Sequence, residues 1–394
     1  MVRLGEIFKR LRFRQVSALL ALLLALPLGW KELTGFYAWL SPFILLNSIF
    51  GLKSVVFLNL AGLVVLVFVI VKKRWFCRKL CPVGLACDWA SSFNSGKKNR
   101  IKKIPSIGKW LAIFSLAGAI LGFPVFAVLD PTAIFNGFFG AFSHSSSLVV
   151  IISLAGFPVL LLIHLFVPGI WCTKLCPLGG LQDEVYRIKE FMVTQMKGDR
   201  KTASVSFGGR RLFLASGFGL VSGLFIPKLL KGETKPYFRP PGSVPKKYFD
   251  FLCVRCGSCI KTCPSSILIH HKDAEDAVSW MIPEISFEKG YCLEDCNLCS
   301  QVCPSGAITL FDTEAKGMLK IGLAEILPQN CLLTQNKECD RCKVACKYNA
   351  IKIDIHGPYD ALPVINHDKC NGCGACFVIC PAEAVRMKHL SSEL

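Results

Sequence analysis

The sequence lacks the motifs that mark the common enzyme classes. No Gly-x-Gly-x-x-Gly follows a segment with strand character, no Ser/His/Asp set presents itself, and no flavin-attachment signature occurs. Histidine is also sparse, with seven in 394 residues. The sequence therefore predicts no catalytic residues in this chain, and its chemistry is expected to come from bound cofactors.

The second half of the chain lacks the positive charge that the whole composition suggests. The formal net charge is +19, but residues 1–231 carry 28 Lys and Arg against 8 Asp and Glu. Residues 232–394 carry 18 against 19. The excess thus lies among apolar runs and leaves no basic stripe with interleaved aromatic residues, so nucleic-acid binding is not expected.

Apolar runs in the first half predict membrane helices. They span residues 16–30, 54–71, 110–128 and 148–167, and most approach the roughly 20 residues that cross a bilayer. The basic N-terminus and basic alternate connections place the N-terminus in the cytoplasm. We expect an α-helical membrane domain of four helices as two repeated pairs, in a prokaryotic inner membrane. Of the histidines only His164 falls within a predicted membrane helix, where we expect a packing residue and no haem.

A fifth apolar segment predicts export of the second half of the chain. Residues 208–227 open with Arg210 and Arg211 and resemble a twin-arginine signal; the alternative is a plain membrane anchor. Either would place the second half on the extracytoplasmic face. We therefore expect four segments: a membrane domain (1–205), a signal or anchor helix (206–230), a proline-rich linker (231–249) and a ferredoxin domain (250–394).

Sixteen of the 21 cysteines lie in four runs with iron–sulfur spacing. Two runs have the form Cys-x2-Cys-x2-Cys-x3-Cys-Pro, one has a first gap longer by one residue, and one has a first gap of seven and lacks the proline. The runs are Cys253, Cys256, Cys259 and Cys263; Cys292, Cys296, Cys299 and Cys303; Cys331, Cys339, Cys342 and Cys346; and Cys370, Cys373, Cys376 and Cys380. Three thiolates on a tight loop can bind three irons of a cubane, while the fourth cysteine points to a neighbouring cluster. We expect these sixteen to bind four [4Fe–4S] clusters.

Short strand-like segments come after every run and precede three of them. Examples are SSILIHH after the first run and LPVINHDKC before the last cysteine run. This is a strand–loop–helix–strand unit repeated four times, which predicts an α+β polyferredoxin domain. Disulfides and zinc sites are the alternatives, and the spacing disfavours both.

The first half contains two half motifs of the form Cys-x3-Cys-Pro. Cys77 and Cys81 precede Pro82, and Cys172 and Cys176 recur 95 positions later. This recurrence predicts an internal duplication whose four cysteines bind a fifth iron–sulfur cluster; the alternative is a structural or redox thiol pair. Cys87 has no partner at motif spacing and is expected to be structural. On the cytoplasmic side, this site would lie about 30 Å from exported clusters.

With these motifs in view, the chain resembles a fusion of two ferredoxin-type families. Residues 1–205 resemble the NapH/MauN polytopic membrane proteins, with Cys-x3-Cys-Pro motifs similar to those of NosR. Residues 206–394 resemble the NapG/MauM four-cluster ferredoxins. The cytoplasmic two-cluster ferredoxin that usually ends the NapH family is absent here. The resemblance implies that the first run shares its clusters with the fourth, and the second with the third: Cys380 with the first three cysteines of run one, Cys263 with those of run four, Cys346 with those of run two, and Cys303 with those of run three.

The leading functional prediction is electron transfer between the quinone pool and an extracytoplasmic redox enzyme or cytochrome subunit. The lipid bilayer and quinone would then be partners, and quinol oxidation within a complex would be its closest approach to enzyme activity. Asp130 and His144 are candidates for accepting quinol protons, although polar loop residues are the simpler interpretation. The alternative functions are an accessory factor that reduces a metalloenzyme during maturation, and an inert scaffold.

Overall fold

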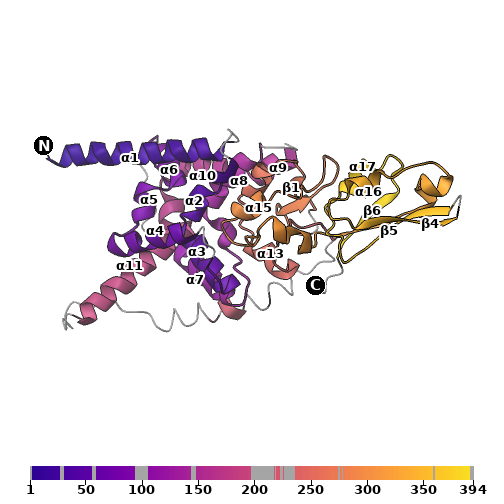
Figure 1. Cartoon of the computed structure of the whole chain (residues 1–394). Coiled ribbons are helices and arrows are strands. Elements are labelled where there is room, and N and C mark those ends of the chain that lie inside the picture. The colour runs from indigo at the N-terminus through magenta and orange to yellow at the C-terminus, as the bar shows by residue number, and fades with distance from the viewer. Residues whose placement is uncertain are drawn as a thin grey trace.

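The structure is a computed structural model of the full chain. It describes residues 2–26, 31–55, 59–93, 105–142, 148–196, 217, 219–221, 225, 236–273, 276, 278–357 and 360–390. The predicted twin-arginine or anchor segment falls almost entirely outside these residues, as does His144. Figure 1 shows a helical part formed by the first half of the chain beside a mixed part formed by the second half.

The first half is helical, and most of its helices between α1 and α11 are short. The helices are α1 (Val2–Ala25), α2 (Phe36–Trp39), α3 (Pro42–Leu52), α4 (Leu60–Val71), α5 (Trp75–Lys79), α6 (Pro82–Ser92), α7 (Ile107–Ile120), α8 (Pro131–Gly140), α9 (Leu148–Ser153), α10 (Gly156–Phe166) and α11 (Pro177–Met196), with the 3-10 helices η1 (Lys31–Leu33) and η5 (Ala127–Leu129) and the π-helical segment η6 (Trp171–Leu175). Several begin with proline at the first position, where the ring fits the helix and costs no hydrogen bond.

The predicted membrane domain is wrong. None of the helices in the described part of the chain combines the length and the apolar composition that a bilayer crossing requires. The run at 54–71 yields α4, whose 12 residues span about 18 Å against an apolar bilayer thickness of about 30 Å. The run at 148–167 is divided into α9 and α10, and α1 is long but basic over its first half. The predicted inner-membrane location and its two faces depended on these spans and are overturned with them.

The second half alternates short helices with two-stranded sheets. Its helices are α13 (Lys246–Leu252), α14 (Ser258–Thr262), α15 (Leu298–Gln301), α16 (Arg341–Ala345) and α17 (Ala375–Ile379), with turns η7 (Glu314–Met318), η8 (Pro328–Asn330) and η9 (Leu333–Gln335). The strands are β1 (Leu268–His270), β2 (Pro283–Ile285), β3 (Leu323–Ile326), β4 (Ile351–Gly357), β5 (Asp360–Ile365) and β6 (Val385–Lys388).

The strands pair as antiparallel sheets β1–β2, β3–β6 and β4–β5. Leu268 lies opposite Ile285 in the first sheet, and Ile326 lies opposite Val385 in the second. Six of the seven predicted strand segments therefore become strands. The seventh, GAITLFD, makes only an isolated bridge between Ser243 and Ile308. The predicted α+β character of this half is thus visible in its elements.

The two halves pack directly against each other. Trp39 of α2 lies in one apolar cluster with residues of the second half, including Phe249 and Leu252. The Trp39 indole donates to the carbonyl oxygen of Val302 at 3.3 Å, and the Ser48 hydroxyl donates to that of Ser305 at 2.9 Å. The expected separation of the two halves by a bilayer core is therefore wrong as well.

Candidate iron–sulfur sites

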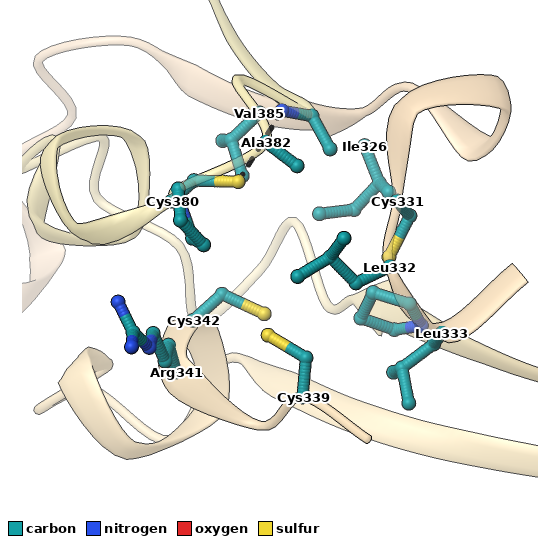
Figure 2. Close-up of a pocket in the computed structure, with 13 residues that line it drawn as sticks. Ile326, Cys331, Leu332, Leu333, Cys339, Arg341, Cys342, Cys380, Ala382 and Val385 are labelled. Atoms are coloured by element: carbon teal, nitrogen blue, oxygen red, sulfur yellow. Dashed lines mark hydrogen bonds between the residues drawn. The ribbon is translucent and has the colours of Figure 1, made fainter. Parts of the chain in front are cut away.

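The sixteen cysteines of the second half gather into four sets, each lining one pocket. Set A is Cys253, Cys256, Cys259 and Cys303; set B is Cys263, Cys292, Cys296 and Cys299; set C is Cys346, Cys370, Cys373 and Cys376; set D is Cys331, Cys339, Cys342 and Cys380. Figure 2 shows the four cysteines of set D around their common cavity. Cys331, Cys339 and Cys342 come from the third run, and Cys380 comes from the end of the fourth. Each set thus takes three cysteines from one run and the fourth from another.

These sets correct the pairing that the resemblance implied. The first run exchanges its fourth cysteine with the second run, and the third run exchanges with the fourth. Cys303 therefore completes set A, where Cys380 was expected, and Cys380 completes set D, where Cys303 was expected. The physical reason is local: runs adjacent in sequence fold as one pseudo-symmetric two-site unit, as in two-cluster ferredoxins.

Local backbone structure places the third and fourth cysteines of each run. The third lies on a short helix, as Cys259 does on α14, and the fourth comes four residues later at the end of that helix. The fourth sulfur then accepts backbone N–H groups from the next turn. Ile308 donates to Cys303 at 3.4 Å, and Ala384 donates to Cys380 at 3.2 Å. Such hydrogen bonds to sulfur tune the potential of a bound cluster.

Burial makes these thiols poor at ionising alone. It raises the pKa of Cys253 to about 12 and that of Cys376 to about 12, and nearby cysteines in each set add to the rise. A thiolate here needs a neighbouring positive charge, which iron supplies. All 21 cysteines are among the described residues and all are free, so no disulfide competes for them. Four thiols around an apolar cavity therefore fit a [4Fe–4S] cluster.

The four sets lie in the order A, B, C, D. Burial raises the pKa of Cys259 in set A, and the charge of Cys299 in set B contributes to the shift. Sets C and D interact in the same way through Cys376 and Cys342.

Sets B and C meet at the junction of the two paired units. The backbone N–H of Cys292 in set B donates to the carbonyl oxygen of Cys373 in set C at 2.9 Å. Burial raises the pKa of Cys373 to about 11, and the charge of Cys292 is among the further causes. Each set therefore has a neighbour close enough for their charges to interact, and the row continues across the junction.

Sequence reasoning missed a buried lysine beside set B. Lys316 is 1% exposed, and its ammonium donates to the carbonyl oxygens of Leu293 and Cys296. It lowers the pKa of Cys292, whose net shift is nevertheless upward because burial dominates. A lysine outside every cysteine run carries no local signal of this role, because only the tertiary fold brings it to the site.

The four cysteines of the half motifs also gather in one place, which we call set E: Cys77, Cys81, Cys172 and Cys176. Burial raises the pKa of Cys81 well above its ordinary value, and the charges of the three other members add to it. The duplication is visible in the local geometry. Gly84 donates its N–H to the sulfur of Cys81 at 3.3 Å, and Gly179 donates to that of Cys176 at 3.4 Å.

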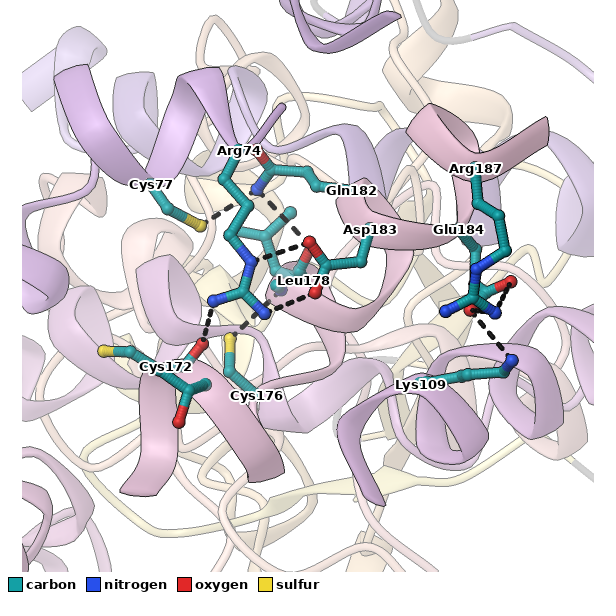
Figure 3. Close-up of polar contacts among 12 residues, drawn as sticks. Arg74, Cys77, Lys109, Cys172, Cys176, Leu178, Gln182, Asp183, Glu184 and Arg187 are labelled. Carbon is teal, nitrogen blue, oxygen red and sulfur yellow. Dashed lines mark hydrogen bonds and ion pairs between the residues drawn. The ribbon is translucent and has the colours of Figure 1, made fainter. Parts of the chain in front are cut away.

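A polar bridge holds the two halves of set E together. The Arg74 guanidinium forms an ion pair with Asp183 at 2.5 Å and also donates to the carbonyl oxygen of Cys172 at 3.0 Å. The Gln182 amide donates to the sulfur of Cys77 at 3.0 Å (Figure 3). Residues from one motif thus position cysteines of the other.

Helix α8 separates set E from set A. Its Phe135 packs in the same apolar cluster as Cys81 and Cys176, whereas the Asn136 amide donates to the carbonyl oxygen of Cys256 at 3.1 Å. Lys261 of α14, which is 2% exposed, donates to the Asn136 amide oxygen at 2.7 Å. Helix α8 therefore forms part of the contact between the two halves, with set E on one side of it and set A on the other.

The carboxyl group of Asp130, a predicted proton acceptor, is buried inside the protein. Asp130 is 0% exposed and caps the start of α8 by accepting the N–H of Thr132 at 2.8 Å. The Ser41 hydroxyl donates to its other oxygen at 2.5 Å. Burial raises the pKa of Asp130, and both carboxyl oxygens accept hydrogen bonds from groups of this protein.

Two domain families match this chain. The 4Fe-4S dicluster domain matches residues 252–307 and 337–384, and the 4Fe-4S binding domain matches residues 55–101 and 149–193. The first match falls on the two paired units, and the second contains both half motifs. No solved structure matches the chain.

Curated relatives are ferredoxin-type proteins. The NapF protein of Escherichia coli K12 is 34% identical over 158 residues, 39% of this chain and 87% of NapF. NapG of the same strain is 32% identical over 169 residues, 40% of this chain and 71% of NapG. The methylamine utilization protein MauM of Methylobacillus flagellatus is 25% identical over 224 residues, 52% of this chain and 92% of MauM. These similarities support the ferredoxin part of the predicted resemblance; the NapH/MauN membrane fusion and the NosR-like motifs are not supported.

Proposed function

Because the chain belongs to the family of ferredoxin-type iron–sulfur proteins that includes NapF and NapG, we propose that it carries electrons through four [4Fe–4S] clusters. Sets A to D would hold one cluster each, with the cysteines named above as ligands. The clusters supply one-electron chemistry when bound. The chain's own residues bind them, exclude water from them and fix their order.

The observation that carries this proposal is the unbroken row of cysteine sets. Within each paired unit, the helices that carry the third cysteines pack against each other, α14 on α15 and α16 on α17, and a backbone hydrogen bond joins sets B and C at the junction of the two units. Isolated structural thiol clusters would not need this continuity, whereas electron transfer does. The row supports transfer between a partner near set D and the helical part near set A.

We extend the proposal to a fifth iron–sulfur site at set E. Its four cysteines share buried surroundings, sulfur-directed N–H groups and a match to a 4Fe-4S binding domain. Because α8 packs against both set E and set A, this site lies at the inner end of the row. In this proposal residues 1–205 form the domain that holds set E, and residues 250–394 form the ferredoxin domain that holds sets A to D.

The partner is proposed to be a redox enzyme that exchanges electrons at one end of the row. The expected bilayer and quinone partners depended on membrane spans, and the described residues form none.

Magnetic interaction between reduced clusters tests the proposal. Fully reduced, anaerobically purified protein should give electron paramagnetic resonance lines broadened by coupling between neighbours. Cys296→Ala should remove the cluster of set B and narrow the lines of set A, because its neighbour is gone. The matched change Cys339→Ala, at the far end of the row, should leave set A unchanged. A spectrum of uncoupled centres, or an equal effect of both variants on set A, would refute the row.

A further inference from the structure

Three side chains that ligate metals meet inside the helical part, beside set E. The sulfurs of Cys87 and Cys172 and a ring nitrogen of His164 all lie within 4.8 Å of one another. Cys87 comes from α6, His164 from α10 and Cys172 from η6. Cys87 and His164 are 0% exposed, whereas Cys172 is half-buried. Two of the three had been expected to be a structural thiol and a packing residue.

The orientation of His164 favours a ligand. Its Nδ1 lies 2.8 Å from the carbonyl oxygen of Leu160, and a carbonyl can only accept. Nδ1 therefore carries the proton in the neutral ring, which leaves a lone pair on Nε2. That atom is buried and meets no N–H or O–H group among the described residues; the polar group that it faces is the sulfur of Cys172. Metal-binding histidines are typically held in this way, with the other ring nitrogen donating to a carbonyl or carboxylate.

The internal duplication supplies a comparison within the same chain. With the 95-position offset that relates Cys77 to Cys172, Cys87 corresponds to Gln182 and His164 corresponds to Val69. Gln182 donates an ordinary hydrogen bond to Cys77, and Val69 is simply buried. The two repeats of the duplication thus differ in the side chains around their first cysteine, Cys77 in one and Cys172 in the other. One half uses an amide and an apolar side chain there; the other uses a thiol and an imidazole.

An imidazole in place of valine is costly unless it has a partner. Burial of a polar atom destabilises the fold unless the atom has a partner, and the partner that the fold offers to Nε2 of His164 is the thiol of Cys172. A metal ion would use that lone pair, and two cysteine sulfurs lie beside it. The sites of sets A to D use cysteine alone, so the mixed sulfur and nitrogen donors point to different chemistry.

We propose that Cys87, His164 and Cys172 bind a single Zn²⁺ ion. Two thiolates and a neutral imidazole are donors that Zn²⁺ prefers, and its tetrahedral geometry leaves one position for a further ligand. Binding would release the two thiol protons.

The zinc site goes beyond the proposed electron transfer and does not require it. Figure 3 shows the sulfur of Cys172 directed away from Cys176 and Asp183. Cys172 is the one residue shared with set E, and a thiolate sulfur has enough lone pairs to bridge two metals. Iron content reports on set E and zinc content reports on this site, so either assignment can fail without the other.

Zinc binding to the full chain provides the test. Anaerobically purified protein is exposed to Zn²⁺, dialysed against metal-free buffer, and analysed for zinc and iron together. X-ray absorption at the zinc edge then identifies the ligands without interference from iron. We expect about one zinc per chain, with two sulfurs at about 2.3 Å and one nitrogen at about 2.0–2.1 Å. Cys87→Ala and His164→Ala should each lose the zinc and keep the iron of sets A to D.

Gln182→Ala is the matched control, because it changes the position equivalent to Cys87 in the other half. It should retain the zinc and its nitrogen ligand. Failure of the wild-type chain to retain zinc overturns the proposal, and so does zinc surrounded by sulfur alone, since that would be zinc in a cysteine set. Retention of zinc by His164→Ala overturns it too. Should a variant fail to fold, the wild-type spectrum still decides through its nitrogen ligand.

Discussion

At the scale of single residues, the fourth cysteine of each run decides how the clusters are shared. It leaves its own run at the end of a short helix and completes the neighbouring set, as Cys303 does for set A. Its sulfur accepts a backbone N–H from the next turn, here from Ile308. The identity of the fourth ligand therefore depends on the fold around the helix end, and the spacing of the run does not reveal it.

Paired cysteine variants test this sharing directly. Cys253→Ala should remove one cluster, about four irons. Adding Cys303→Ala should remove no more, because both residues serve set A. Adding Cys380→Ala should remove about four further irons, because Cys380 serves set D. The measurement is iron and acid-labile sulfide per chain; the opposite result for the two double variants would restore the pairing of the first run with the fourth.

His270 is a second residue whose surroundings carry a prediction. It is 6% exposed, and burial lowers its pKa to about 4. The unfolded chain binds a proton below a pH of about 6.5, and the folded chain does not until about 4. Stability should therefore fall as the pH drops from about 6.5 to about 4, by roughly 3 kcal/mol in total, and be unaffected by this group above that window.

Denaturation midpoints at pH 7 and pH 5 measure this effect. His270→Phe should reduce the loss of stability between the two values, whereas His367→Gln, at an exposed position, should leave the loss as it is in the wild type. Equal losses in the wild type and in His270→Phe would show that burial of this ring does not set the acid limit.

At the scale of elements, much of the second half could be predicted from sequence. The cysteine spacing and the alternating segments indicated the short helices and most of the strands, because these depend on local backbone geometry. The helical part was harder. A window of apolar residues does not register that α4 begins only at Leu60 or that the chain turns at Leu154 and Ala155, so membrane spans were predicted where short helices form. Likewise, Cys87 and His164 lie far apart in sequence, and only the packing of α6 against α10 brings them together.

Helix α8 is the element that joins the two halves, and its fit is testable. A Cβ added to Gly137 would lie 2.8 Å from the carbonyl oxygen of Arg255, closer than backbone atoms tolerate. Gly137→Ala should therefore displace α8 and destabilise the protein by about 1–3 kcal/mol. Gly217→Ala is the control, because a Cβ there meets nothing within 4 Å. Thermal unfolding compares them; equal stability of the two variants would mean that the close approach at α8 is not a constraint.

At the scale of the whole molecule, the chain is a row of cysteine sites built on two paired units and anchored on a helical part. Sets A and B form one unit and sets C and D the other, with Cys292 and Cys373 at their junction. Set E lies behind α8 at the inner end. This arrangement uses twenty of the 21 cysteines, all but Cys87, and an electron carrier of this kind needs a series of neighbouring sites.

The content of iron and acid-labile sulfide in the full chain tests this arrangement most directly. Protein purified without oxygen should contain about twenty of each per chain, and the Cys77→Ser, Cys81→Ser double variant should contain about sixteen, as expected for five and four [4Fe–4S] clusters. A wild-type value of about sixteen would mean that set E holds no cluster, and would leave the assignment of sets A to D unaffected. About twelve or fewer irons in the double variant would contradict the central claim that sets A to D each hold a cluster.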